Sequence, residues 1–340
     1  MQARIERVEV VPYALPFAEP YVTARGRLER RELVLLRLFA DGLVGLGETT
    51  ALSLRGGRAL ARIVEDLRRV RPLPQGGVDR PVGASLEALA AIEIALLDLA
   101  GKRAGKPAWR VLGADAARPI ECNATLTAGP PEEVARQALA WAERGFTSFK
   151  LKTGMDGDVE QVSAARNALG ATASLRVDAN GAWRVAEAAK RLAAMAPLEL
   201  AEQPVATLPE LEELHQLTPI SLAADESVAT PEDARAAAPS CSYATVKLAK
   251  VGGPAAALAI SRELPVYLSS ALDGPVGIAA AAHVAQALPG AGIAHGLATQ
   301  LLFAESIGQG AELDGPLLRV PGGPGLGVEL DEPALARFRI

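Results

Sequence analysis

The chain has 340 residues, of which 49% are hydrophobic and 22% are charged, and this composition excludes an intrinsically disordered protein. The net charge is −5 and no basic tract is present, so we expect no nucleic-acid partner. No apolar run reaches the roughly 18–20 residues of a membrane span, the N-terminus lacks a signal-peptide core, and Cys122 and Cys241 form no CxxC motif. We expect a cytoplasmic protein with two buried thiols and no membrane partner.

The first 115 residues combine predicted strands with predicted helices. Alternating apolar residues predict three strands, and the Asp41-Gly42 pair predicts a hairpin turn between the last two. Two stretches with helical periodicity follow. The predicted elements are strands over Ile5–Val11, Glu32–Phe39 and Leu43–Glu48, an exposed polar loop over Glu19–Arg27, and helices over 57–69 and 86–103. Residues 1–115 are therefore expected to form an α+β unit.

From about residue 116 onward, short apolar runs alternate with amphipathic helices. Eight of these runs end between 22 and 27 residues apart, a spacing typical of a (β/α)₈-type barrel. The runs end near Leu126, Lys152, Asp178, Glu202, Asp225, Lys247, Ser270 and Leu297. An open doubly wound sheet is the alternative, but the glycine-rich phosphate loop expected after its first strand is missing. We predict a barrel over residues 116–314, with the tail from 315 packing back on the N-terminal unit.

Five successive predicted strands end in charged side chains. Asp178, Glu202 and Asp225 end the third, fourth and fifth strands, and lysines end the second and sixth. The C-terminal ends of barrel strands meet at one mouth, where burying charges together is costly unless they compensate one another. Three carboxylates that face one centre are hard oxygen ligands and suit Mg²⁺. The three acids are therefore the predicted metal ligands, with three solvated loop acids as the alternative.

The lysines flank the predicted metal site from opposite sides of the ring. Lys150 and Lys152 are two residues apart, so both point to the same side of their strand. Lys152 is nearer the mouth and is the predicted base, and Lys150 is then a second cation that lowers the pKa of Lys152. Lys247 lies opposite, and Lys250 is expected to be a solvated loop residue. This arrangement predicts abstraction of a proton α to a carboxylate, with Mg²⁺ and a lysine stabilising the enediolate.

The motifs KLK, DAN, EQP, ADES and VKLAKVGG follow one another along the chain. Together they resemble the enolase superfamily and, within it, the muconate-lactonizing-enzyme subgroup. The mandelate-racemase subgroup would instead carry a histidine at the end of the seventh strand, where this chain has Ser269 and Ser270. The resemblance covers nearly the whole chain.

The resemblance implies an α/β fold class with a (β/α)₇β TIM-type barrel over residues 116–314. An N-terminal α+β capping domain over residues 1–115 would be completed by segment 315–340. One Mg²⁺ is implied as cofactor. By motif, its ligands are Asp178, Glu202 and Asp225, and the acid/base pair is Lys152 and Lys247.

Within the subgroup, the segment Ser269–Thr299 is similar to o-succinylbenzoate synthases of actinobacterial type, and Arg176 fits that group. The implied reaction is a Mg²⁺-dependent syn dehydration of 2-succinyl-6-hydroxy-2,4-cyclohexadiene-1-carboxylate to 2-succinylbenzoate in menaquinone biosynthesis. N-succinylamino acid racemases, dipeptide epimerases and another lyase or cycloisomerase are alternatives, although the residues after His295 lack the Asp-x-Asp element typical of the epimerases. A catalytically inactive scaffold is a further alternative, but no metal acid or lysine is lost.

The same resemblance places the substrate contacts. The cap loop Thr23–Gly26 would close over the site with Arg25 meeting a substrate carboxylate, and the succinyl tail would rest at the seventh and eighth strand ends. The predicted substrate-binding residues are Lys150, Arg25, Arg176, Ser269, Ser270 and Leu297. The expected partner is a small-molecule carboxylate substrate, and the oligomeric state is left open.

Overall fold

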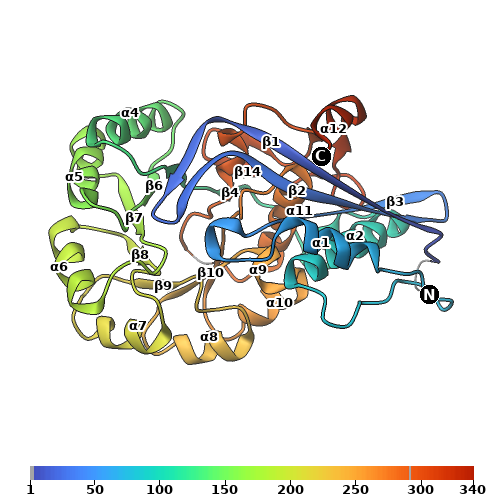
Figure 1. The fold of residues 1–340 in the computed structure, drawn as a ribbon, viewed down its shortest axis with the longest axis horizontal. Coiled ribbons are helices and arrows are strands. Elements are labelled where there is room, and N and C mark those ends of the chain that lie inside the picture. The colour runs from blue at the N-terminus through green and yellow to red at the C-terminus, as the bar shows by residue number, and fades with distance from the viewer. Residues whose placement is uncertain (1–3, 291) are drawn as a thin grey trace.

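The computed structural model describes residues 4–290 and 292–340 and places an antiparallel sheet with helices beside a barrel of parallel strands (Figure 1). The antiparallel sheet has the order β1-β2-β3. Its strands are β1 (Arg7–Thr23), β2 (Gly26–Ala40) and β3 (Leu43–Thr50), and the helices beside it are α1 (Leu60–Arg68), α2 (Leu86–Ala104) and α3 (Ala108–Val111). Asp41 and Gly42 have φ angles of 52° and 75°, as the predicted hairpin turn requires.

The first two strands are longer than expected, and the polar loop predicted over Glu19–Arg27 is wrong. β1 and β2 stay paired almost to their tip, with Tyr21 opposite Leu28. Tyr21 is buried and Arg27 is exposed, so the polar residues of this segment belong to the solvent side of a hairpin. A break in register between Pro16 and Tyr21 interrupts the alternation that would otherwise have indicated a strand.

The N-terminal sheet is buried on both faces. Leu33 and Leu35 of β2 pack against the barrel, whereas Val34 between them packs against α1 and α2. On β3, glycine is needed for α2 to approach, because a Cβ atom at Gly47 would lie 1.9 Å from the carbonyl oxygen of Ala91. The sheet is therefore held between two layers, and residues on one of its faces can reach the barrel.

Seven parallel strands form the barrel sheet in the order β11-β10-β9-β8-β7-β6-β5. They are β5 (Ala124–Leu126), β6 (Ser148–Lys152), β7 (Ser174–Asp178), β8 (Leu200–Glu202), β9 (Leu222–Ala224), β10 (Tyr243–Val246) and β11 (Val266–Leu268). The eighth apolar run closes the ring, because His295 bridges Cys122 and Gly296 bridges Ser269, both in parallel. The predicted barrel is confirmed, and the open doubly wound sheet is excluded because its edges would stay unpaired.

Helices follow the barrel strands and lie outside the ring (Figure 1). They are α4 (Pro131–Ala142), α5 (Asp158–Leu169), α6 (Val185–Met195), α7 (Leu208–His215), α8 (Pro231–Ala237), α9 (Leu248–Val251), α10 (Pro254–Ile260) and α11 (Pro275–Ala287). Capping boxes at Thr207 and Thr230 determine where α7 and α8 begin. Helix α11 is buried along almost its whole length because it lies between the barrel and the N-terminal unit, where it contacts β3 and α3.

The C-terminal segment contacts both parts of the molecule. Its elements are β12 (Gly308–Gln309), β13 (Glu312–Asp314), β14 (Leu317–Arg319), β15 (Glu329–Leu330) and α12 (Glu332–Phe338). A short strand that precedes the barrel sheet, β4 (Ile120–Glu121), is its partner. Strand β14 pairs with β4, while the backbone N–H of Leu326 donates to Asp98 of α2 (2.7 Å). The domain boundaries at residues 115 and 315 stay a prediction.

A buried acidic residue, Glu48, joins β3 to the start of α11. Glu48 accepts hydrogen bonds from Tyr13 Oη (2.8 Å) and from the backbone N–H groups of Val276 (3.3 Å) and Gly277 (3.1 Å). Burial, and then the nearby carboxylate of Asp273, raise the pKa of Glu48 to about 7. Since the ordinary pKa of a glutamate is about 4.3, the folded protein holds a proton there over a pH range in which the unfolded chain releases it.

We therefore expect Glu48 to make the free energy of unfolding depend on pH between about 4.3 and 7. Protonated Glu48 stabilises the fold below the lower value, and this contribution, on the order of 3 kcal/mol, is lost as the pH rises through about 7. Glu48→Gln should flatten the dependence of Tm on pH over this interval, as measured by calorimetry. Glu212→Gln, at an exposed position of α7, is the control; a variant slope equal to that of the wild type would contradict the prediction.

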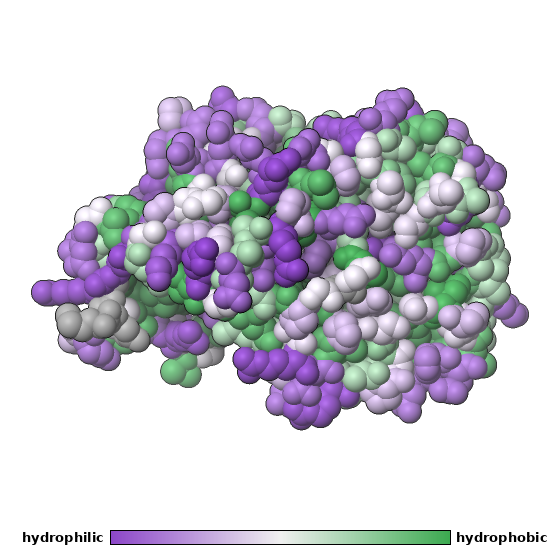
Figure 2. Space-filling model, turned by 180° about the vertical axis from the view of Figure 1, so that it is seen from behind, coloured by the Kyte–Doolittle hydropathy of each residue, from purple (hydrophilic) through white to green (hydrophobic). Residues whose placement is uncertain are grey.

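The described helices are too short or too polar to cross a membrane. On the face shown in Figure 2, hydrophilic residues are interspersed with hydrophobic ones. Across residues 4–290 and 292–340, no helix combines the length and the apolar character needed to cross a bilayer. The longest of the described helices, α2, has 19 residues but includes Glu93, Asp98 and Lys102.

Candidate active site

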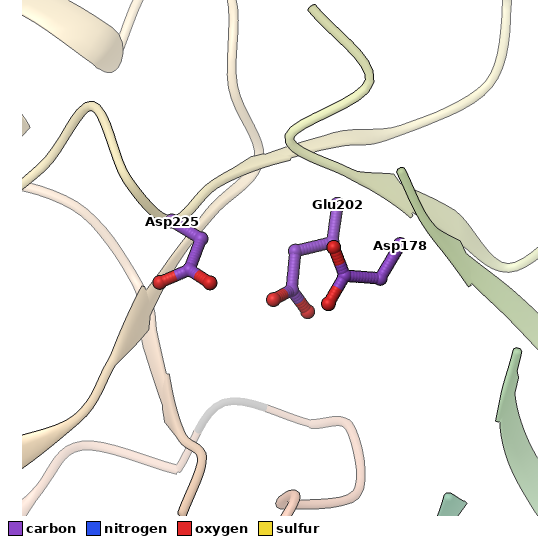
Figure 3. Close-up of side chains that lie close together, drawn as sticks. All are labelled: Asp178, Glu202 and Asp225. Carbon is purple, nitrogen blue, oxygen red and sulfur yellow. The ribbon is translucent and has the colours of Figure 1, made fainter. Parts of the chain in front are cut away.

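Three carboxylates meet at the mouth of the barrel. Asp178 and Glu202 are the last residues of β7 and β8, and Asp225 directly follows β9. One oxygen from each lies within 4.8 Å of those of the other two, and all three side chains are fully buried. Figure 3 shows the carboxylates close together, each carried by a different segment of the chain. The structure therefore brings the three predicted metal ligands into one acidic cluster.

The acidic cluster has the properties of a divalent-cation site. Burial, and then the neighbouring Asp178 carboxylate, raise the pKa of Glu202, because both disfavour a further negative charge. Glu202 Oε1 is buried and accepts no hydrogen bond from any residue in the described ranges. A cation held among the three carboxylates would relieve the repulsion and satisfy this oxygen, and hard oxygen donors suit Mg²⁺. The residues present therefore fit Mg²⁺.

Lys150 and Lys152 of β6 contact the acidic cluster from one side. Lys150 Nζ lies 2.5 Å from Glu202 Oε2 and 2.9 Å from Asp178 Oδ2, and Lys152 donates to the same Asp178 oxygen (2.6 Å). Burial would lower the pKa of Lys150, but the carboxylates of Asp178 and Glu202 outweigh burial and raise that pKa. Lys150 is therefore a cation beside Lys152, and its effect on Lys152 stays a prediction.

Lys247 and Lys250 contact the acidic cluster from the opposite side. Lys247 directly follows β10 and donates to Asp225 Oδ2 (2.5 Å). Lys250 lies 3.0 Å from Asp225 Oδ1 and donates to the carbonyl of Thr245 (2.9 Å). The expectation of a solvated Lys250 is wrong, because the one-turn helix α9 directs this side chain back into the barrel, where it is buried. Strands β7, β8 and β9 separate β6 from β10, so Lys152 and Lys247 face each other across the cluster.

A cavity lies between the N-terminal hairpin and the barrel mouth. Among the described residues that line it, every charged one is a cation. These cations are Arg31 from β2, Lys150 and Lys152 from β6, and Lys247 from the end of β10. Positive walls of this kind concentrate and bind small anions. The cavity therefore has the charge expected of a binding site for a carboxylate substrate.

Two family models match the chain. "Mandelate racemase / muconate lactonizing enzyme, N-terminal domain" matches residues 5–113, and "Enolase C-terminal domain-like" matches residues 133–334. A solved structure of muconate lactonizing enzyme from Pseudomonas fluorescens, complexed with muconolactone, covers 100% of both chains with 31% identity and a TM-score of 0.93. The chain belongs to the muconate-lactonizing-enzyme subgroup of the enolase superfamily. The resemblance inferred from the strand-end motifs is thus confirmed.

Other members of this subgroup that are similar to the chain have different activities. The o-succinylbenzoate synthase of Thermobifida fusca is 39% identical over 233 residues, which cover 65% of this chain and 71% of that protein. A dipeptide epimerase from Enterococcus faecalis V583, solved with Mg and the dipeptide L-Leu-L-Tyr, is 28% identical over 96% of this chain and 99% of that one, with a TM-score of 0.87. Together with the fit of the acidic cluster, the Mg in that relative confirms Mg²⁺ as the cofactor expected from the sequence.

The structure brings only some of the predicted substrate-binding residues to the cavity. Lys150, Ser269 and Ser270 line it. Leu297, in contrast, is fully buried in the hydrophobic core beside the segment that closes the barrel. It is not among the described residues of the cavity wall, so its expected contact with the substrate tail is not supported.

Two predicted arginine contacts also lie elsewhere. Arg176 is fully buried within β7, where it donates to the carbonyl of Ala294 (2.6 Å) and pairs with Glu199. Arg25 is at the tip of the β1–β2 hairpin and donates to the carbonyl of Asn180 (2.6 Å), in the loop after β7. Neither arginine belongs to the cavity wall as the described residues form it. Arg176 therefore braces the barrel, and Arg25 holds the hairpin tip against a barrel loop.

The sequence reasoning missed two residues of the site, Arg31 and Tyr267. Arg31 is buried and lines the cavity. The sequence could have indicated this, because Arg31 is two and four residues before Leu33 and Leu35, the positions of β2 that face the barrel. Tyr267 of β11 donates to Glu202 Oε2 (2.6 Å). Burial, and then the charge of Glu202, raise the pKa of Tyr267 well above its ordinary value, so it stays a neutral donor. A tyrosine within an apolar strand gives no comparable signal, because a tyrosine at such a position is equally common as an ordinary residue of the hydrophobic core.

Proposed function

We propose that the protein is an o-succinylbenzoate synthase, a lyase of menaquinone biosynthesis. It would remove water from 2-succinyl-6-hydroxy-2,4-cyclohexadiene-1-carboxylate and release 2-succinylbenzoate. The identity of 39% with the synthase of Thermobifida fusca supports this proposal. That match covers 65% of the chain, and the charges of the cavity are a second, independent indication of the substrate.

The charge of the cavity wall is the observation that carries the proposal against a dipeptide substrate. The proposed substrate has two carboxylates and no cationic group, and the cavity is lined by one arginine and three lysines but by none of the described acidic residues. A dipeptide carries an ammonium group, which the arginine and lysines of the wall would repel. The carboxylates of the acidic cluster lie behind the lysines and are absent from the described wall. This arrangement favours a diacid over a dipeptide.

The two lysines have distinct tasks in the proposed reaction. Lys152 Nζ, in its neutral form, would take the proton α to the ring carboxylate and deliver it to the departing hydroxyl group on the same face, which balances the loss of one water molecule. Lys247, on the opposite side of the acidic cluster, would stabilise the negative charge that develops on the substrate. Mg²⁺ bound by Asp178, Glu202 and Asp225 would act as a Lewis acid toward the substrate carboxylate. Tyr267 and Lys150 hold Glu202 in place for that role.

A second candidate is N-succinylamino acid racemisation, and the facing lysines favour it. Racemisation needs one group to remove the α-proton from one face and another to return a proton to the other face. Lys152 and Lys247 contact the acidic cluster from opposite sides, which is the required arrangement. An N-succinylamino acid is also a diacid without an ammonium group, so the cavity wall does not distinguish between the two substrates.

The ratio of the two activities decides between these candidates. Purified protein with Mg²⁺ should convert the cyclohexadiene substrate at least as fast as it racemises N-succinylphenylglycine, each followed at saturating substrate. A chelator-treated sample supplies the background for both reactions. Racemisation that exceeds dehydration would overturn the synthase proposal and support the racemase.

A further inference from the structure

We infer that Arg31 binds the tail carboxylate of the substrate and thereby selects diacids over monoacids. The identity of the diacid rests on the proposed function. The inference about Arg31 rests on where the capping sheet places a buried cation. None of the sequence motifs that point to the superfamily includes this residue, since it lies on β2 rather than on a barrel strand.

The fold delivers Arg31 to the cavity through the periodicity of β2. Leu33 and Leu35 pack against the barrel, and a residue two positions earlier points to the same side of the strand. The Arg31 side chain accordingly lines the cavity and is 4% exposed. Its Nη2 atom donates to the carbonyl of Ala271 (2.7 Å), and its Nη1 atom donates to Ser53 Oγ (3.3 Å). These contacts hold the guanidinium group above the turn that follows β11.

Arg31 lies at the side of the cavity away from the proposed base. The backbone N–H of Ser269 donates to Val246 (2.9 Å), which places the start of the β11 turn beside Lys247. Ala271, to which Arg31 is bonded, is two residues further along. Lys152 is on β6, four strands from β10. A ligand with one carboxylate at the lysines and the acidic cluster would therefore extend its tail past Ser269 and Ser270 toward Arg31.

The surroundings of Arg31 suit a carboxylate with an apolar spacer. Leu52, Leu54 and Leu272 line the same cavity and can contact methylene groups of the tail. Asp273 lies behind the turn, where it accepts hydrogen bonds from Ser270 Oγ (3.0 Å) and the Ala271 N–H (3.0 Å). Burial raises the pKa of Asp273, and the charge of Arg31 opposes that rise. The carboxylate of Asp273 thus stabilises the charge of Arg31 from outside the cavity. Because Arg31 is buried, it also attracts a second anion, the tail carboxylate, strongly.

The experiment pairs a change in the protein with the matching change in the ligand. Calorimetry with Mg²⁺ present compares 2-succinylbenzoate with 2-butanoylbenzoate, in which a methyl group replaces the tail carboxylate. The wild type should bind the diacid roughly 30-fold or more tightly than the monoacid. Arg31→Met should lose this preference while binding the monoacid within about threefold of the wild type, and Arg31→Lys should restore part of it because it keeps the charge.

Arg30→Met is the matched control, because Arg30 is the exposed neighbour of Arg31 on the same strand. It should keep the full preference for the diacid. If Arg31→Met weakened the binding of both ligands equally, the inference would be overturned, because Arg31 would then act only by holding the turn that follows β11. An undiminished preference in that variant would overturn it as well.

The same measurement separates the inference from the proposed function. If the wild type binds neither benzoate, the synthase proposal fails and the comparison is repeated with N-succinylphenylglycine and N-butanoylphenylglycine. A preference for the succinyl ligand that depends on Arg31 would then support the inference for a racemase. If no ligand pair shows a preference that Arg31→Met removes, the inference is overturned.

Discussion

Lys152→Ala should reduce dehydration to the uncatalysed rate, whereas Lys247→Ala should retain activity that is lower by roughly 10²–10³-fold. A dehydration needs a base on one face only, and the methyl group of alanine cannot accept a proton. Lys152 lines the cavity beside Asp178 (2.6 Å), and Lys247 lies on the other side beside Asp225 (2.5 Å). The measurement is the steady-state rate of 2-succinylbenzoate formation with Mg²⁺ present.

Isotope exchange distinguishes the two lysines independently of dehydration. If an N-succinylamino acid is incubated in D₂O, the wild type should exchange the α-proton of both enantiomers. Each lysine reaches one face, so Lys152→Ala should lose exchange with one enantiomer and Lys247→Ala with the other. Lys190→Ala, at an exposed position of α6, should exchange both. Normal dehydration by Lys152→Ala would show that the base is misassigned and would make Lys150 the candidate.

The barrel and the charges at its mouth could be predicted because both depend on the periodicity of the chain. Strands β6, β7 and β8 end at Lys152, Asp178 and Glu202, the residues at which the apolar runs end. A parallel strand inside a barrel is buried on both faces, so its sequence changes abruptly from apolar to charged where it reaches the mouth. The segment that closes the barrel also ended in an apolar run, although among the described residues only His295 and Gly296 form its bridges.

Contacts made by long side chains could not be predicted, because periodicity does not indicate which distant group such a side chain reaches. Arg25 donates to Asn180, a residue 155 positions away, rather than facing the cavity. Lys250 looks like an exposed loop residue until the single turn of α9 directs it to Asp225. Arg31 shows the opposite case: its position in phase with Leu33 and Leu35 was present in the sequence, but the predicted strand began only at Glu32, whereas β2 begins at Gly26.

Glu202→Gln, Asp178→Asn and Asp225→Asn should each abolish turnover. Each change keeps the shape of the side chain but removes one of three negative charges that hold Mg²⁺. The loss is severe here because Lys150, Lys152, Lys247 and Lys250 also contact the acidic cluster, so the two remaining carboxylates would have too little negative charge left to hold a divalent cation. Treatment of the wild type with a chelator should have the same effect, and added Mg²⁺ should restore the rate.

Thermal unfolding without substrate tests whether these carboxylates act by holding the ion. A ligand at about 100 times its Kd stabilises the folded state by about 2.7 kcal/mol, so Mg²⁺ should raise the Tm of the wild type by a measurable amount. Glu202→Gln should show no such rise, whereas the matched control Glu212→Gln, exposed on α7, should respond as the wild type does. A Glu202→Gln protein that is inactive but still stabilised by Mg²⁺ would mean that Glu202 serves the reaction in another way. Full activity in the chelated wild type would remove the metal from the mechanism altogether, and the lysines that contact the three buried carboxylates would then be the groups that offset their charge.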